Sequence, residues 1–157
     1  MPASPADEQI RILFSHPDPE SRKQTATALG GTGGDRPAIA ALVRALHDTD
    51  RGVRAAVAAA LAAIGAPAVA SLIVALEDGD WVVRYRAAEA LGSIRDERSG
   101  TALLRALSDR RDHVRYMAAK GLGRLGEKRA IGPLTEALSD ENEFVRRAAE
   151  RALAALR

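Results

Sequence analysis

The sequence predicts an all-α fold: a right-handed alpha-alpha superhelix of about five two-helix repeats. A Val-Arg pair recurs about every 31 residues, and apolar residues within each repeat follow a helical period. No segment shows the sustained alternation of apolar and polar residues that a strand would need. Because a two-helix unit of this size cannot bury its apolar face alone, successive units are expected to stack.

Recurring arginines set the register of the repeats. Successive members are 32, 30, 31 and 31 residues apart, and a leucine follows each of them by seven residues. The arginines are Arg22, Arg54, Arg84, Arg115 and Arg146. A closing aspartate keeps the same phase, as Asp48, Asp78, Asp109 and Asp140. So many positions in phase indicate repeated architecture.

This register divides the chain, expected to be a single domain over 1–157, into repeats and two half-repeats. The half-repeat at 7–15 is predicted to be an N-terminal cap, with Ile10 and Phe14 in core positions. The full repeats are predicted at 19–48, 50–78, 80–109 and 111–140, and a C-terminal half-repeat cap at 143–157. Small residues on the first helices, such as Ala87, Gly121 and Ala152, would let neighbouring helices approach closely.

Helix boundaries follow from capping residues. The first helix of a repeat is expected to begin at a polar or acidic N-cap, for which the candidates are Asp50, Asp80 and Asp112. It is expected to end at a glycine, such as Gly65 or Gly126. The second helix often opens near a proline, as at Pro37 and Pro67, which suits a first helical turn.

The repeat unit resembles the HEAT-like repeats of the phycobilisome-lyase type. The stretch from Asp80 to Arg95 reads DWVVRYRAAEALGSIR, and that from Arg129 to Asp140 reads RAIGPLTEALSD. The resemblance covers almost the whole chain. It implies that the Val-Arg helices line the concave side of a solenoid, where such repeats usually bind partners. The family includes chromophore-lyase subunits and protein adaptors, so the resemblance does not fix a function.

A predicted partner-binding face lies on the first helices, opposite their core stripe. Four of the five aromatic residues fall on this face, whereas a core-building role would place them on the stripe. Trp81, Tyr85 and Tyr116 are the first candidates for binding. The whole set is Trp81, Val82, Tyr85, Arg86, Glu89, His113, Tyr116, Met117, Lys120, Phe144, Arg147 and Arg151. The alternative is that these long side chains only cover neighbouring repeats, or that a loop folds over them.

The periodic arginines and aspartates are interpreted as structural. Arg54, Arg84, Arg115 and Arg146 lie beside the core stripe, in phase with the aspartates that close each repeat. Charge-assisted hydrogen bonds between the two sets would tie each turn to the next helix. Recurrence in every repeat favours this role over ligand binding.

No catalytic, metal or cofactor site is predicted. The histidines, His16, His47 and His113, stand in different repeats, and the His-Glu pairs with which deoxyhypusine hydroxylases of similar repeat architecture hold iron are absent. The glycines of 30–34 lack the Lys-Ser/Thr ending of a phosphate loop and follow no strand. There is no cysteine, which excludes disulfides and thiolate chemistry and fits a reducing compartment. The protein is therefore not expected to be an enzyme.

A cytoplasmic protein, favoured as a monomer, is expected, without a signal peptide or membrane span. The uncharged stretch from Ala55 to Leu76 is long enough to cross a bilayer, but Gly65, Ala66 and Pro67 break it where the other repeats also break. The net charge is only +2, with both signs interspersed. Residues 81–129 nevertheless carry 12 Lys and Arg against six Asp and Glu.

The sequence thus predicts a non-catalytic scaffold or adaptor whose partner is a protein or peptide. Two alternatives stay open. The basic balance of 81–129 leaves room for nucleic-acid binding, although many of these cations fall at turns or architectural positions. The family resemblance alone suggests an accessory role in chromophore attachment.

Overall fold

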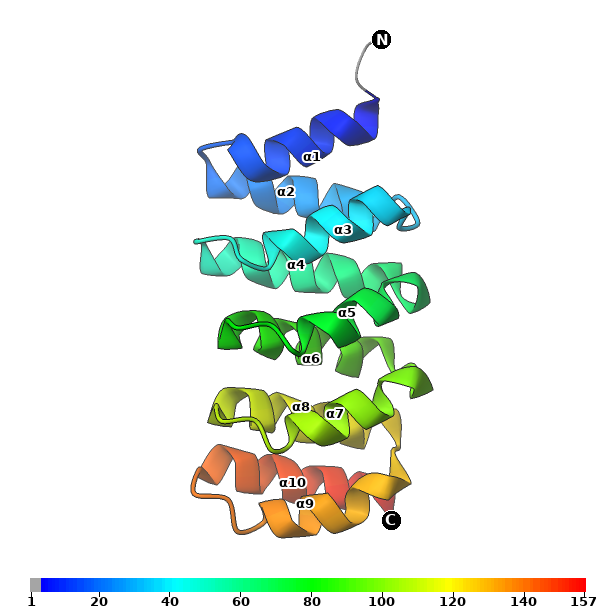
Figure 1. Ribbon diagram of the computed structural model, residues 1–157, viewed down its shortest axis with the longest axis vertical. Helices are drawn as coiled ribbons and strands as arrows, with labels where there is room; N and C mark the ends of the chain where they lie inside the picture. Colours follow the sequence, from blue (N-terminus) through cyan, green and yellow to red (C-terminus); the bar gives the residue numbers. More distant parts are fainter. Residues whose placement is uncertain (1–3) are drawn as a thin grey trace. The chain divides into compact units, whose positions relative to one another are not determined.

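The computed structural model describes residues 4–157, and within them it contains ten α-helices, three short 3-10 helices and no strand (Figure 1). The first three residues of the predicted domain lie outside the described range. The predicted all-α class is confirmed. The α-helices are α1 (Pro5–Ser15), α2 (Pro19–Gly30), α3 (Arg36–Ala45), α4 (Arg51–Ile64), α5 (Val69–Ala75), α6 (Trp81–Ile94), α7 (Gly100–Ala106), α8 (Asp112–Leu125), α9 (Ile131–Ala137) and α10 (Glu143–Leu156). The 3-10 helices η1 (Ala66–Ala68), η2 (Glu97–Ser99) and η3 (Lys128–Ala130) lead into α5, α7 and α9.

The helices form two compact units, one ending at Ser71 and the other beginning at Leu72, within α5. In the first unit, α1 packs on α2 and α3, and α2 packs side by side with α4. In the second unit, the first helices of successive repeats, α6, α8 and α10, lie next to one another in that order (Figure 1). The second helices α7 and α9 pack on α8 and α10 respectively.

Capping side chains start most of the first helices. Asp50 accepts a hydrogen bond from the Val53 amide, and Asp80 accepts one from the Val82 amide, as predicted. Gly65 and Gly126, both with φ 77°, end α4 and α8, also as predicted. The prediction for Asp112 is wrong. This residue is the first of α8, and the cap position is held by Arg111, whose side chain makes no capping bond.

The cores are built mainly from leucine, valine and alanine. Leu29, Leu61, Leu91 and Leu122, which follow the repeated arginines by seven residues, are all fully buried. In α1 the core position is filled by Leu13. Phe14, expected there from its spacing, is instead 37% exposed, with the Arg44 guanidinium 3.9 Å from its ring centroid.

Small residues bring neighbouring first helices into backbone contact. A Cβ atom added at Gly92 on α6 would lie 2.9 Å from the Cα of Gly121 on α8. One added at Gly123 on α8 would lie 2.8 Å from the Cα of Ala152 on α10. Both distances are too short for a real side chain, and the obstructing atoms belong to the backbone. Glycine at these positions therefore sets the spacing between helices.

A series of ion pairs links the first helix of a repeat to the turn that closes the same repeat. Arg22 donates from Nε and Nη2 to both carboxylate oxygens of Asp48, at 2.8 and 3.0 Å. Arg84 binds Asp109 in the same way, at 2.7 and 2.9 Å, and Arg115 binds Asp140 at 2.8 and 3.0 Å. Each arginine thus reaches the aspartate that closes its own repeat. Two parallel bonds to one carboxylate are among the stronger and more directional interactions that proteins use.

The same guanidinium groups also hold the turn before their own helix. Nη1 of Arg84 donates to the carbonyl of Asp78 at 2.8 Å, and Nη1 of Arg115 donates to the carbonyl of Asp109 at 2.9 Å. Equivalent bonds run from Arg54 to the Asp48 carbonyl and from Arg146 to the Asp140 carbonyl, both at 2.7 Å. One side chain therefore joins two successive turns of the stack. We call these arginines and aspartates the Arg–Asp ladder.

No single helix in the described part of the chain is long and apolar enough to span a membrane. Only the bent pair of Arg51–Ile64 and Ala66–Ala75 reaches the required length and composition, and it does so only when both helices are counted together.

Replacing Gly123 by alanine is expected to destabilise the protein by about 1–3 kcal/mol, because the new methyl group must push α8 away from the Ala152 backbone. Thermal and urea unfolding measure the change. Gly79→Ala, at an exposed position in the turn before α6, is the matched control: no atom of a non-adjacent described residue lies within 4 Å of the added Cβ, so stability should stay within about 0.5 kcal/mol of the wild type. Equal effects of the two substitutions would contradict a tight contact at Gly123.

Replacing Asp140 by asparagine should cost about 2 kcal/mol at pH 7, because Arg115 loses its charged acceptor. The hydrogen bond from Arg115 outweighs burial and lowers the pKa of Asp140 below its ordinary value of 3.8. The carboxylate therefore contributes stability above pH 3.8, and this contribution is lost as the pH falls through the lower native pKa.

Unfolding measured from pH 7 downward should thus show the wild type and Asp140→Asn converging in stability below about pH 3.8. Glu136→Gln, on the exposed face of α9, serves as the control and should follow the wild type throughout. A constant difference between wild type and Asp140→Asn at every pH would show that the ionised carboxylate is not what stabilises the turn.

Candidate functional site

Aromatic side chains from three neighbouring helices gather on one face of the second unit. Trp81 and Tyr85 come from α6, His113 and Tyr116 from α8, and Phe144 from α10. Phe144 is 59% exposed, His113 is exposed, and the other three are half-buried. We call these five residues the aromatic strip. Their exposure is unusual in a chain with so few aromatic residues, since packing in a core would bury them.

Ring contacts hold the α6 side of the aromatic strip together. The ring centroids of Trp81 and His113 are 5.2 Å apart, and those of Tyr85 and His113 are 6.5 Å apart. The Arg111 guanidinium lies 4.6 Å from the Trp81 ring centroid, within the range of a cation–π interaction. His113 on α8 therefore contacts two aromatic residues of α6.

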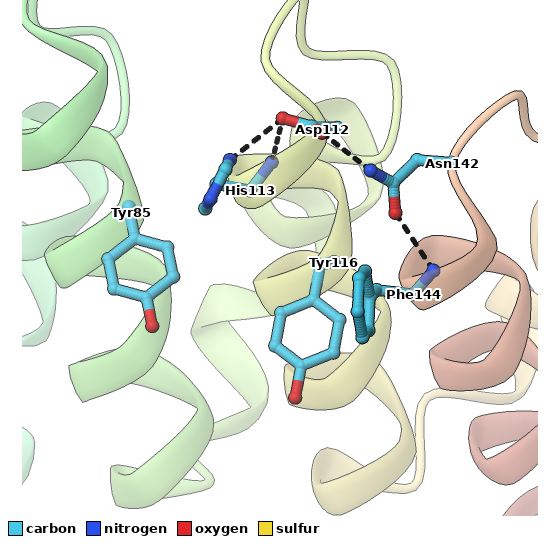
Figure 2. A pocket seen from close by; sticks show the side chains of 6 residues that line it. All are labelled: Tyr85, Asp112, His113, Tyr116, Asn142 and Phe144. Carbon is cyan, nitrogen blue, oxygen red and sulfur yellow. Dashed lines mark hydrogen bonds and ion pairs between the residues drawn. The ribbon is translucent and has the colours of Figure 1, made fainter.

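A hydrogen-bonded frame fixes the helix starts beside the aromatic strip. One carboxylate oxygen of Asp112 accepts from the His113 amide and lies 2.8 Å from His113 Nδ1. The other accepts from Asn142 Nδ2 at 2.6 Å, and Asn142 Oδ1 accepts from the Phe144 amide at 2.8 Å (Figure 2). The hydrogen bond to His113 lowers the pKa of Asp112. The starts of α8 and α10 are thereby joined through side chains.

A hollow of about 260 Å³ opens in front of this frame. Figure 2 shows Tyr116 on α8 and Phe144 on α10 lining it, with Tyr85 on α6. Asp112, His113 and Asn142 complete the lining. The combination of aromatic rings with a few fixed polar groups is typical of small recognition pockets.

A second hollow, of about 240 Å³, continues along the same two helices. Tyr116 lines both hollows, so they meet at this side chain. The second is lined by Tyr116, Lys120, Gly123, Arg124, Ala148, Arg151, Ala152 and Ala155. Together we call them the α8–α10 groove. Its small residues include the contact between Gly123 and Ala152 that brings the two helices together.

Some residues predicted for the binding face lie elsewhere. Met117, expected to be exposed, is only 4% exposed. The reason is that α8 is flanked by both α6 and α10, so more than one stripe of its surface is covered. Arg86 is largely buried and pairs with Glu89 at 2.7 Å, which leaves it little freedom to bind a partner.

The remaining predicted residues are at least partly accessible. Val82 and Lys120 are half-buried, while Arg147 and Arg151 are exposed. Lys120 lies 5.9 Å from the Tyr116 ring centroid. Arg147 approaches Glu143 at 3.5 Å, a contact between exposed side chains that contributes little to stability.

Sequence reasoning missed Asn142 as a member of the site and gave Asp112 the wrong role. Counting four residues back from each repeated arginine would have placed the N-cap positions of α8 and α10 correctly. That position holds Asp18, Asp50, Asp80, Arg111 and Asn142, so arginine replaces the aspartate in the fourth repeat and asparagine replaces it in the C-terminal half-repeat. Asp112 lies one residue after this position, and its second carboxylate oxygen accepts a hydrogen bond from Asn142. Four residues of the groove were also missed, because they lie where α8 and α10 come together: Gly123, Arg124, Ala152 and Ala155.

Within residues 4–157, no group of three or more His, Asp or Glu side chains is placed to hold a metal ion. His113 lies beside Asp112, while His16 and His47 belong to the other compact unit.

Comparison with known families and structures matches this architecture. A model of HEAT repeats matches residues 7–75 and 69–154. No curated protein matches the chain significantly. A solved structure of the complex of CpcE and CpcF of phycocyanin lyase from Nostoc sp. PCC7120 is similar, with 28% identity and a TM-score of 0.71. The similarity covers 99% of this chain and 66% of that one, so the chain spans just under two thirds of its length.

More distant structures share the fold alone. A designed armadillo repeat protein in complex with the peptide (KR)4 is 21% identical, with a TM-score of 0.60 over 95% of this chain and 80% of that one. Human deoxyhypusine hydroxylase is 19% identical, with a TM-score of 0.62 over 96% of this chain and 73% of that one. These matches confirm the predicted fold class, an alpha-alpha superhelix. The chain belongs to the HEAT repeat family, and its repeats are of the phycobilisome-lyase type that the sequence resembles.

Proposed function

We propose that the protein is a non-catalytic scaffold or adaptor that binds a protein or peptide segment across the aromatic strip. One observation carries this proposal: three adjacent helices each contribute an accessible aromatic side chain to one hollow, through Tyr85, Tyr116 and Phe144. Aromatic residues dominate the energetics of protein interfaces because they bury a large area at low entropic cost. Similar structures include a complex of two lyase subunits and a peptide-bound repeat protein, which supports a macromolecular partner.

The frame beneath the aromatic strip favours binding without large rearrangement. Asp112 and Asn142 fix the starts of α8 and α10, and His113 fixes the orientation of Trp81 and Tyr85 through ring contacts. A preorganised surface loses less conformational entropy when it binds. The arginines and aspartates of the Arg–Asp ladder, in contrast, form hydrogen bonds inside the protein, and we assign them no part in binding.

Alanine at Trp81, Tyr85 and Tyr116 together should abolish partner capture while the fold survives. Single substitutions at Trp81 or Tyr116 should each weaken binding by about 2 kcal/mol, the usual loss at an aromatic hot spot. The measurement is an affinity pull-down from native lysate at low and moderate salt, followed by calorimetric titration of the captured protein. Phe14→Ala, which removes the one aromatic residue outside the strip, is the matched control. Undiminished capture by the triple variant would refute the proposal.

An accessory role in chromophore attachment is the second candidate, because of the similarity to phycocyanin lyase subunits over 99% of this chain. If this role applies, the purified protein incubated with a bilin should acquire the absorbance band of the bound pigment. The Tyr85→Ala/Tyr116→Ala variant should lose this band. An unchanged pigment spectrum in the presence of wild-type protein would exclude bilin binding by this chain alone.

A further inference from the structure

The two ends of the α8–α10 groove differ in charge. The end near the helix starts contains Asp112, whose carboxylate is already engaged by His113 and Asn142. The other end is lined by Lys120, Arg124 and Arg151, and no acidic residue contributes to its lining. Cations on both walls of a narrow groove produce a positive potential inside it.

These three cations make no ion pair with any described residue, in contrast to several other arginines of this unit. Arg84 and Arg115 bind aspartates of the ladder, Arg86 binds Glu89, and Arg129 binds Glu127. The groove end is therefore a place where positive charge is left uncompensated within the chain. An occupant with negative charge would supply the missing partner.

We infer that the α8–α10 groove binds an acidic peptide segment anchored by one large apolar side chain. The inference rests on the proposed function and names the chemistry of the partner. The apolar side chain enters the hollow between Tyr85, Tyr116 and Phe144. Aspartate or glutamate side chains of the same segment then bind Lys120, Arg124 and Arg151. Charge-assisted hydrogen bonds to Arg and Lys give such a contact direction as well as affinity.

Helix geometry sets the spacing within this segment. Lys120 and Arg124 lie four and eight residues after Tyr116, or about 6 and 12 Å along α8 at 1.5 Å per residue. An extended peptide advances about 3.3 Å per residue. The acidic residues are therefore expected about two to four positions from the apolar anchor.

A peptide fits this surface better than a nucleic acid does. The floor of the groove is apolar, with Ala148, Ala152 and Ala155. The positive charge is confined to one end, whereas a nucleic-acid backbone needs cations along its whole track.

The test selects peptides on the full-length chain from a phage-displayed library of random dodecapeptides. Enriched peptides are then synthesised with a fluorescent label, and their binding is measured by anisotropy. The groove variant is Lys120→Glu/Arg151→Glu, and the matched control is Arg105→Glu/Arg110→Glu, which changes the net charge equally at exposed positions outside the groove. Circular dichroism verifies the fold, and Lys120→Gln/Arg151→Gln replaces the groove variant if that variant fails to fold.

Enriched peptides are expected to combine an aromatic or large aliphatic residue with Asp or Glu two to four positions away. Their affinity should fall at least about tenfold in the groove variant and by no more than about twofold in the control. Replacing the acidic residues of a selected peptide with serine should cause a similar loss.

Three other results would overturn the inference in distinguishable ways. Peptides that depend on Tyr116 but lack acidic residues would leave the proposed function standing and refute the acidic partner. No peptide that depends on Tyr116 would count against both. Tighter binding of a twenty-residue oligothymidine, lost in the same groove variant, would show that the occupant is a nucleic acid.

Discussion

Backbone contact between neighbouring first helices is the constraint on which the second unit depends. Where Gly92 meets Gly121 and Gly123 meets Ala152, there is no room for side chains between the helices. Interiors of this kind gain their stability from many close contacts of small groups, and they are sensitive to added volume. The aromatic residues of this unit consequently lie outside the contacts between helices, on the accessible face that α6, α8 and α10 form side by side.

The same spacing explains why the binding surface lies between helices as well as on one helix face. Because α8 and α10 approach closely at Gly123 and Ala152, longer side chains on either side of the contact form walls. Tyr116 stands at the junction of the two hollows. A groove with a closely packed floor is therefore a direct product of the packing, and its chemistry is set by the residues on its walls.

The periodic spacing of apolar residues predicted the fold well because it follows directly from which residues are buried. The leucines seven residues after each arginine are buried as expected in α2, α4, α6 and α8. Individual side chains were harder to place. Met117 is covered because α8 has helices on both sides, and the bond between Asp112 and Asn142 joins residues 30 positions apart. Angular position on one helix cannot report contacts that a second helix supplies, so the frame and the groove emerge only in three dimensions.

The residues of the Arg–Asp ladder hold each repeat in place, and they are different from the residues that face outward and could contact a partner. Arg84 and Arg115 each bind the turn behind them and the aspartate ahead of them, and neither bond involves the outward residues of their helices. A duplicated repeat that keeps this donor and acceptor can enter the array and then diverge freely on its outer face. Specificity in such an array can evolve one repeat at a time, while the inherited joints between repeats stay the same.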